Sequence, residues 1–136
     1  MAIIDDKYTG HISSEVDILI TRQKGRSIAE YLGFSSCQQV LIATAISELV
    51  RNIVQYAGEG EIVIEVVRAK GRLGISIIAS DEGPGIPNIE LAVQRGYSTS
   101  RGLGLGLAGV KKLMDDVVII SEVNVGTTIT VKKWLG

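Results

Sequence analysis

The sequence has few aromatic residues, a single cysteine and no marked excess of charge of either sign. Phe, Trp and Tyr make up 4% of the 136 residues, so the core must be built from Ile, Val, Leu and Ala. Because Cys37 is the only cysteine, no internal disulfide can form, and a reducing compartment fits best. A net charge of −1, without a basic run or patch, gives no electrostatic footprint for binding nucleic acid.

Long apolar runs are absent as well. No run approaches the roughly 18 residues of a membrane-spanning helix, so we expect no membrane contact. The N-terminus has no basic segment followed by an apolar one, which argues against a signal peptide. Repeats, low-complexity stretches and linkers are also missing. The chain is therefore expected to be one cytoplasmic domain that spans residues 1–136.

Hydrophobic patterning predicts an α+β fold. Strands are expected at about 8–16, 61–69, 73–79, 117–122 and 127–133, the first of them at a sheet edge. Helices are expected at about 17–32, where Gly33 is a plausible stop, and at 36–56, where Ser35 or Ser36 is the expected cap. A third helix is expected at 105–115 and a further short one at 89–95. The apolar stripe of the long helix is Val40, Ala43, Ile46, Leu49 (or Val50) and Ile53. Two hairpins imply a two-layer α/β sandwich, with a mostly antiparallel sheet under one layer of helices.

The most distinctive stretch is rich in glycine. Gly102, Gly104 and Gly106 stand at alternate positions, just before an apolar helical run. Such glycines let backbone N–H groups approach an anion, and the helix that follows adds the positive end of its dipole. By itself this pattern is more typical of an ordinary turn. A dinucleotide-binding fingerprint would need a parallel βαβ unit, and a P-loop would need a following Gly-Lys-Ser/Thr; both are absent.

Glu48 and Asn52 are four residues apart on the long predicted helix, so they share one face. A carboxylate can accept a proton, and an amide oxygen can bind a hard cation such as Mg²⁺. The alternative is a solvated helix face. Against that alternative, apolar residues flank the pair and place it at the border of the core-facing stripe. The spacing alone favours neither interpretation.

Asp81 follows an apolar strand and precedes the glycine turn at 82–86. A carboxylate there can accept a hydrogen bond from an adenine amino group, and the glycines let the backbone close over a flat base. The alternative is a simple Asx turn. Gly126 and Thr127 form an ordinary entry into a strand, although the Thr hydroxyl could reach a base edge.

Three further residues are not expected to carry chemistry. His11, the only histidine, lies in a predicted edge strand with no carboxylate or cysteine cluster near it. Cys37 has no histidine partner in the sequence pattern and is interpreted as a buried or bystander thiol. Trp134 is expected to pack against the end of a strand, although an exposed tryptophan could anchor a partner.

The order of these elements is more specific than any one of them. Glu-x-x-x-Asn on a helix is followed by Asp-x-Gly-x-Gly-Ile, by Gly-x-Gly-x-Gly and by Gly-Thr. This arrangement resembles the ATP-binding fold of the GHKL superfamily, which includes type II topoisomerases, Hsp90 chaperones, histidine kinases and MutL proteins. The resemblance runs from about residue 40 to the end. Together with the short length of the chain, the segment at 96–101 narrows the resemblance to one branch of this superfamily. That branch is the bacterial serine/threonine kinases of the anti-sigma-factor type, including stressosome switch kinases.

The resemblance implies a role for each matching residue. Glu48 would be the general base, Asn52 would hold Mg²⁺ against the triphosphate of ATP, and Asp81 would recognise the adenine amino group. Arg101 would be a candidate for neutralising the γ-phosphate. The further nucleotide contacts would come from Gly83, Gly85, Ile86 and Thr127, from the lid residues Ser98, Thr99, Ser100 and Arg101, and from Gly102, Leu103, Gly104, Leu105, Gly106 and Leu107.

The resemblance also implies partners. A STAS-domain protein would be the phosphorylated substrate, and the released kinase would activate a downstream phosphatase by binding it. An anti-sigma factor, in which ATP gates the capture of a sigma factor, is the competing class of function. A histidine kinase catalytic domain fits less well, because the residues before Ser36 cannot supply a phosphoacceptor helical hairpin. A homodimer is left open.

Overall fold

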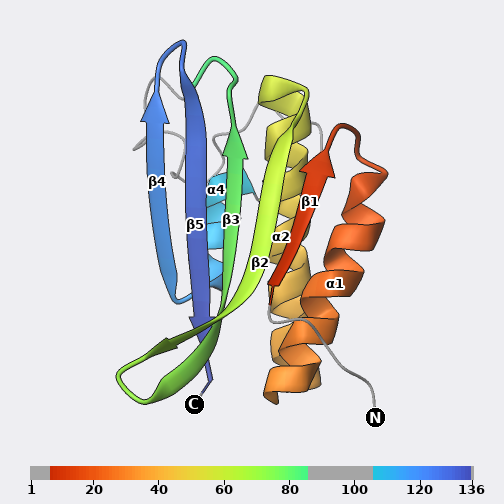
Figure 1. Cartoon of the computed structure of the whole chain (residues 1–136), viewed down its shortest axis with the longest axis vertical. Coiled ribbons are helices and arrows are strands. Elements are labelled where there is room, and N and C mark those ends of the chain that lie inside the picture. Colours follow the sequence, from red (N-terminus) through yellow and green to blue (C-terminus); the bar gives the residue numbers. More distant parts are fainter. Residues whose placement is uncertain (1–6, 86–105, 136) are drawn as a thin grey trace.

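The computed structural model describes residues 7–85 and 106–135, and it is drawn as a whole in Figure 1. Five strands form one sheet in the order β1-β2-β3-β5-β4, and each neighbouring pair is antiparallel. The strands are β1 (Lys7–Ile12), β2 (Gly60–Ala69), β3 (Arg72–Asp81), β4 (Asp116–Glu122) and β5 (Gly126–Trp134). The helices are α1 (Asp17–Leu32), α2 (Ser36–Ala57) and α4 (Gly106–Leu113).

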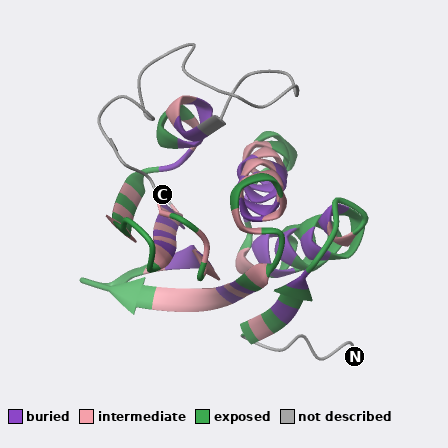
Figure 2. Cartoon of the chain, turned by 90° about the horizontal axis from the view of Figure 1, so that it is seen from above, coloured by how far each residue is buried: buried purple, intermediate pink, exposed green. Residues whose placement is uncertain are grey.

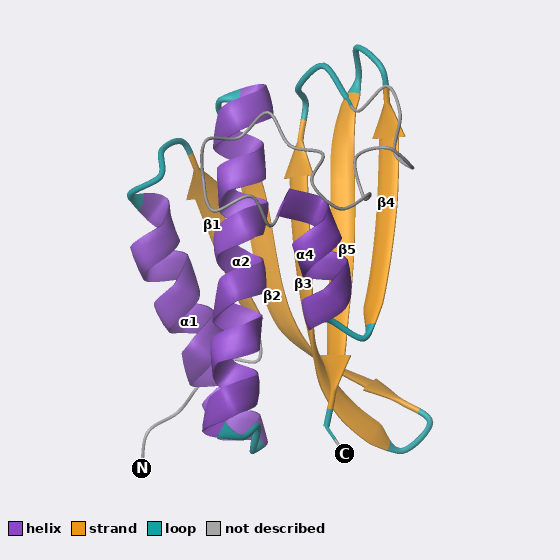
Figure 3. Cartoon of the chain, turned by 180° about the vertical axis from the view of Figure 1, so that it is seen from behind, coloured by secondary structure: helices purple, strands orange, loops and turns teal. Residues whose placement is uncertain are grey.

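The described helices α1, α2 and α4 lie on the same side of the sheet, as the view from above in Figure 2 and the view from behind in Figure 3 both show. The predicted two-layer sandwich with an antiparallel sheet is therefore confirmed. β1 lies at one edge of the sheet, as expected, and β4 lies at the other. In the part of the chain that the structure describes, no helix is long and apolar enough to cross a membrane.

The core between the two layers is aliphatic, as the scarcity of aromatic residues predicts. Phe34 is the one aromatic side chain among the buried residues of the described segments. The rest of the core is formed by Ile, Leu, Val and Ala side chains from the described helices and from the inner face of the sheet, together with Met114, which follows α4. Val40, which the stripe of the long helix included, is 51% exposed. It lies 200° around the helix from the fully buried Ile42, so it points away from the core.

The first predicted strand is too long at its C-terminal end. The strand ends at Ile12 rather than near Val16, and α1 begins at Asp17. The Asp17 carboxylate accepts hydrogen bonds from the backbone N–H groups of Ser13 (2.8 Å) and Ser14 (3.0 Å), which turns the chain into the helix. Side-chain bonds of this kind compete with a strand ladder for the backbone donors.

The turn before α1 should be sensitive to acid. The N–H groups of Ser13 and Ser14 hold the pKa of Asp17 below its ordinary value. The ionised Asp17 carboxylate therefore stabilises the folded chain at pH values above its unfolded pKa of about 4. This stabilisation is lost as the pH falls through the lower pKa that Asp17 has in the folded chain. We expect Asp17→Ala to lower the melting temperature at neutral pH, and this difference from wild type to shrink below about pH 4. Glu15→Ala, which removes an exposed carboxylate nearby, is the control and should show no such pH dependence.

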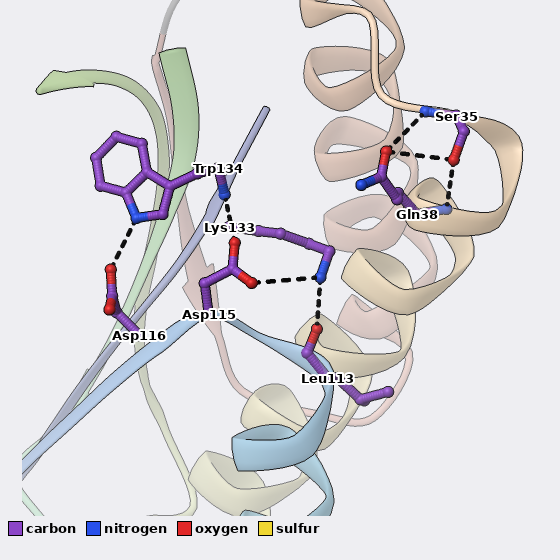
Figure 4. A network of polar contacts seen from close by, with 7 residues as sticks. All are labelled: Ser35, Gln38, Leu113, Asp115, Asp116, Lys133 and Trp134. Carbon is purple, nitrogen blue, oxygen red and sulfur yellow. Dashed lines mark hydrogen bonds and ion pairs between the residues drawn. The ribbon is translucent and has the colours of Figure 1, made fainter. Parts of the chain in front are cut away.

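The end of α1 and the start of α2 both lie where the sequence predicts them. Gly33 ends α1 in the left-handed conformation, with φ of 102°. Ser35 caps α2: its side chain accepts from the Gln38 N–H at 3.1 Å, and the Gln38 side chain accepts from the Ser35 N–H at 3.2 Å (Figure 4). This capping box satisfies backbone donors that the first turn of a helix leaves without partners. Cys37, in that first turn, is an exposed free thiol rather than a buried one.

The C-terminal end of α4 is tied to the end of β5. The Lys133 Nζ donates to the Leu113 carbonyl at 2.9 Å and lies 4.0 Å from Asp115 Oδ1 (Figure 4). The Trp134 backbone N–H donates to Asp115, and its indole Nε1 donates to Asp116, both at 2.8 Å. The helix ends before the predicted position because the Asp115 N–H already donates to a β5 carbonyl. Trp134 packs at the end of its strand, as expected.

Lys133 should therefore matter for stability. Its side chain is 11% exposed, and it satisfies one of the carbonyl groups that the last turn of a helix leaves without partners. Lys133→Met keeps most of the apolar stem but removes the donor, and we expect a loss of about 1–3 kcal/mol in the free energy of unfolding. Urea unfolding measures the change. Lys111→Met, at an exposed position of α4, is the control and should change the free energy of unfolding by less than about 0.5 kcal/mol.

Candidate functional site

On the face of the sheet that the helices cover, a row of small or polar residues lies at the end of the strands, next to the C-terminal end of β3. The strand registers place these residues side by side across four strands, and we call them the end row: Gly60, Asp81, Thr127 and Ser121. The neighbouring row on the same face is apolar and consists of Ile62, Ala79, Ile129 and Ile119. The end row therefore marks the place where the core stops and polar chemistry becomes possible between the layers.

The C-terminal turns of α2 lie directly over this end of the sheet. A Cβ atom added to Gly60 would lie 2.8 Å from Ile53 Cγ2 and 2.5 Å from the Ser80 carbonyl oxygen. A Cβ atom on Gly83 would lie 2.7 Å from Ala57 Cβ. The absence of side chains at both glycines is therefore what lets α2 approach the end row. Asn52 precedes Ile53 in the chain, so it belongs to the part of α2 that lies there.

The turn after β3 is held from two sides. The Gly83 N–H donates to Asp81 Oδ1 at 2.9 Å, so the Asx turn is real. The Asn124 N–H donates to the Pro84 carbonyl at 2.8 Å, which ties the turn to the hairpin between β4 and β5. Gly85 has a φ of 80°, and a Cβ atom on it would collide with the Glu122 backbone. These contacts fix the backbone around the Asp81 carboxylate and leave Oδ2 without a bond to this turn.

Gly126 is required by the same packing. Its φ is 149°, and a Cβ atom would collide with the carbonyl oxygen of Asp81 on the neighbouring strand. The close approach brings Thr127 opposite Asp81 in the register. The sequence elements around Asp81 and Gly126 therefore meet in space, as the resemblance implies.

Ser121 is a residue of the end row that sequence reasoning missed. Its hydroxyl lies 2.8 Å from the Thr127 hydroxyl, and either oxygen can donate. When the Ser121 hydroxyl donates to the Gly126 carbonyl at 3.3 Å, the Thr127 hydroxyl is the donor to Ser121. Thr127 is 5% exposed, so its hydroxyl is oriented by this neighbour rather than by bulk solvent. The alternation in 117–122 places Ser121 on the inner face, but only the hairpin register reveals that it lies opposite Thr127.

Glu48 is not on a solvated helix face. Its side chain is 11% exposed, and Oε1 accepts a hydrogen bond from Arg51 Nη1 at 3.0 Å. Arg51 is 33% exposed and lies three residues further along the same helix. Asn52, one turn after Glu48, is half-buried. A carboxylate this far removed from water, with one oxygen held by a cation, is an oriented group.

Of the nucleotide contacts predicted at 98–107, only Gly106 and Leu107 belong to the described residues. Gly106 is the first residue of α4, and Leu107 is 6% exposed and belongs to the core. The predicted short helix at 89–95 lies outside the described residues. So do the predicted nucleotide contacts Ile86, Ser98, Thr99, Ser100, Arg101, Gly102, Leu103, Gly104 and Leu105.

A hollow of about 650 Å³ lies at the same end of the molecule and has an acidic lining. It is bordered by Asp81, Glu82, Glu59, Glu61 and His11, among others. His11 has one carboxylate close to it, since Glu59 Oε2 is 3.6 Å from His11 Nε2. Both side chains are more than half exposed. In residues 7–85 and 106–135, no group of three or more His, Cys, Asp or Glu side chains is placed to hold a metal ion.

The fold and the end row define the class of protein. The chain belongs to the family of histidine kinase-, DNA gyrase B- and HSP90-like ATPases, whose family model matches residues 37–135. ATP is the nucleotide of this family. The end row fits it, because Asp81 and Thr127 are neighbours in the strand register and each has a side chain that another residue holds in place.

The relatives in this family include a kinase that matches almost the whole chain. The sequence is 50% identical to the serine/threonine-protein kinase RsbT of Bacillus subtilis (strain 168) over 132 residues, which cover 97% of this chain and 99% of that protein. It is 39% identical to the anti-sigma F factor of Geobacillus sp. (strain WCH70) over 101 residues, which cover 69% of this chain and 68% of that factor.

Solved structures agree on the fold. The mycobacterial sensor histidine kinase MprB superposes with a TM-score of 0.58 at 16% identity, over 93% of this chain and 96% of that chain. The catalytic domain of histidine kinase ThkA gives a TM-score of 0.55 at 17% identity, over 93% of this chain and 95% of that chain. At such low identity, the likeness concerns the fold alone.

Proposed function

We propose that the chain is an ATP-dependent serine/threonine protein kinase that phosphorylates a STAS-domain protein. The observation that carries the proposal is the setting of Glu48, whose side chain is 11% exposed and fixed by Arg51. It stands one turn before Asn52, on the helix that packs over the end row. The 50% identity to a serine/threonine-protein kinase over nearly the whole chain supports the same activity.

The proposed reaction needs positioning and charge neutralisation more than covalent help from the protein. The oxygen of the acceptor hydroxyl forms a bond to the γ-phosphorus of ATP. The bond from that phosphorus to the bridging oxygen breaks, and its electron pair leaves with ADP. The hydroxyl proton passes to Glu48. Because Arg51 occupies Oε1, Oε2 is the oxygen that takes the proton.

The other groups hold the nucleotide in this scheme. Asp81 accepts a hydrogen bond from the adenine amino group through Oδ2, since Oδ1 is used by the Gly83 N–H. Thr127, oriented by Ser121, faces the same base. Asn52 supplies an amide oxygen to Mg²⁺, which when bound neutralises charge on the triphosphate. The glycine-rich segment before α4 supplies backbone N–H groups to the phosphates.

A protein acceptor fits the surface of α1. Val16, Leu19 and Ile20 are all more than half exposed, which is typical of a surface that contacts another protein. In the proposed cycle, phosphorylation of the STAS-domain protein releases the kinase. The free kinase then binds and activates a downstream phosphatase in the cytoplasm.

The experiment is a transfer of labelled γ-phosphate from ATP, with Mg²⁺, to a purified STAS-domain protein. We expect the label on the acceptor protein to survive acid, because serine and threonine phosphoesters are stable in acid. We also expect no label when the acceptor serine or threonine is replaced by Ala. Acid-labile label on a histidine would contradict the proposal and would instead favour a histidine kinase.

An anti-sigma factor is the second candidate, favoured by the relatives of that name at 33–39% identity. In that case, ATP would create a surface that captures a sigma factor, and phosphorylation would be secondary. Binding of a purified sigma factor to the immobilised chain, with and without ATP, separates the two candidates. ATP-dependent retention favours the anti-sigma factor, whereas no retention favours the kinase alone.

A further inference from the structure

Two hydroxyl groups of the end row are paired across the strands β4 and β5. Ser121 and Thr127 are opposite each other in the register, and their side-chain oxygens are 2.8 Å apart. Thr127 is 5% exposed, so bulk water has little access to its hydroxyl. Within residues 7–85 and 106–135, Ser121 is the one group that forms a hydrogen bond with this hydroxyl. The direction of that bond therefore decides what Thr127 can offer to a ligand.

The direction of the bond follows from the protons that the two hydroxyls carry. A hydroxyl has one proton to donate, whereas a carbonyl oxygen can only accept. Ser121 Oγ lies 3.3 Å from the Gly126 carbonyl oxygen, so the proton of Ser121 is the one that forms that bond. Thr127 is then the donor in its contact with Ser121. Any other bond in which the Ser121 hydroxyl donates has the same consequence, and the Thr127 oxygen is left with its lone pairs alone.

Asp81 presents lone pairs at the same place. It lies directly opposite Thr127 on β3, on the same face of the sheet. The Cβ atoms of such cross-strand neighbours are about 4.5–5.5 Å apart. Oδ1 of Asp81 accepts from the Gly83 N–H, and an ionised carboxylate has no proton to donate through either oxygen. The two neighbouring side chains therefore act together as a pair of acceptors.

We propose that Ser121 is a positioning residue that makes the end row selective for a purine with an amino group, rather than a carbonyl, at ring carbon C6. The inference rests on the proposed function, in which the end row binds the base of ATP. The two N–H bonds of an amino group diverge by about 120°, so two acceptors that share it lie about 5 Å apart. This separation matches that of cross-strand neighbours, about 5 Å. A carbonyl at C6 would instead bring its own lone pairs against those of Asp81 and Thr127, with no proton between them.

Inosine triphosphate (ITP) is the probe for this selectivity, because its base has a carbonyl at C6 and a hydrogen on N1 and otherwise matches that of ATP. Competition calorimetry measures the affinities of both nucleotides for the full chain. We expect the wild type to prefer ATP. Ser121→Ala frees the Thr127 proton, which can then turn toward the ITP carbonyl, so the ratio of ATP affinity to ITP affinity should fall by about tenfold. Ser121→Thr keeps a hydroxyl at this position and should keep the wild-type ratio.

Two further variants separate this role from a structural one. Ser80→Ala makes the same chemical change at the same end of the sheet but on its opposite face, because Ser80 precedes Asp81 in β3. It should keep the wild-type ratio. Thr127→Val removes the hydroxyl through which Ser121 acts, so the addition of Ser121→Ala to this variant should not change the ratio any further.

The outcomes distinguish this inference from the proposed function. Equal losses of ATP and ITP affinity in Ser121→Ala would overturn the inference, because a serine that only stabilises the hairpin weakens both nucleotides alike. An effect of Ser121→Ala on the ratio that persists beside Thr127→Val would overturn it too. If the wild type prefers ATP and Ser121→Ala keeps that preference in full, the inference fails while the proposed function stands. A wild-type chain that binds neither nucleotide would refute both.

Discussion

Glu48→Gln should leave ATP bound and lower the rate of phosphoryl transfer by about 10²–10⁴-fold, the range expected when a general base is removed. Glutamine has nearly the same shape and can still accept from Arg51, so the local structure around the 3.0 Å contact should persist. Only the capacity to take the hydroxyl proton is lost. Single-turnover transfer of labelled phosphate to the acceptor protein measures the rate, and calorimetry measures ATP affinity.

Glu65→Gln provides the matched control for this experiment. Glu65 lies on β2, outside both the end row and the proposed acceptor surface of α1, so the substitution makes the same chemical change away from the site. It should transfer phosphate at the wild-type rate. A Glu48→Gln variant that also keeps the wild-type rate would remove Glu48 from the chemistry. A variant that loses ATP affinity and rate together would indicate a binding role instead of a base.

The second large effect is expected at Asp81. Asp81→Asn keeps the Oδ1 acceptor for the Gly83 N–H, so the turn should be preserved. It replaces the second carboxylate oxygen with an amide N–H₂, which would face the adenine amino group donor to donor. We expect ATP affinity to fall by about 10–100-fold, which corresponds to a loss of 1–3 kcal/mol for a mismatched polar contact. The melting temperature without nucleotide should change little.

Glu82→Gln is the control for Asp81, because it removes a negative charge one residue away at an exposed position. If the affinity loss in Asp81→Asn came only from lower net charge near the phosphates, Glu82→Gln would show the same loss. We expect it to bind ATP as the wild type does. Equal losses in the two variants would contradict recognition of adenine by Asp81.

Most of the element pattern could be predicted because it depends on short-range chemistry. The alternation of apolar residues, the Gly33 stop and the Ser35 cap each act within one or two turns of chain. The errors arose where a side chain competed for the backbone, as Asp17 does with the N–H groups of Ser13 and Ser14. Residues 13–16 do not continue the strand because Asp17, which follows them in the sequence, accepts hydrogen bonds from the backbone N–H groups of Ser13 and Ser14.

The candidate site was only partly accessible from the sequence. The spacing of Glu48 and Asn52 places both on one face, but it does not show that Glu48 is 11% exposed or paired with Arg51. Ser121 was missed because its relation to Thr127 depends on the register of β4 with β5. At Asp81, the two interpretations were treated as alternatives. In the structure, one oxygen makes the Asx turn, and in the proposed function the second oxygen accepts from the adenine amino group, so the two interpretations do not exclude each other.

The central claim is that the end row and α2 together form a site for ATP with Mg²⁺. Calorimetric titration of the chain with ATP, in the presence and absence of Mg²⁺, tests it most directly. We predict a single site per chain that binds more weakly without the metal and is weakened by Asp81→Asn but not by Glu82→Gln. No measurable binding of ATP with Mg²⁺ to the wild-type chain, or an affinity indifferent to Asp81→Asn, would contradict it.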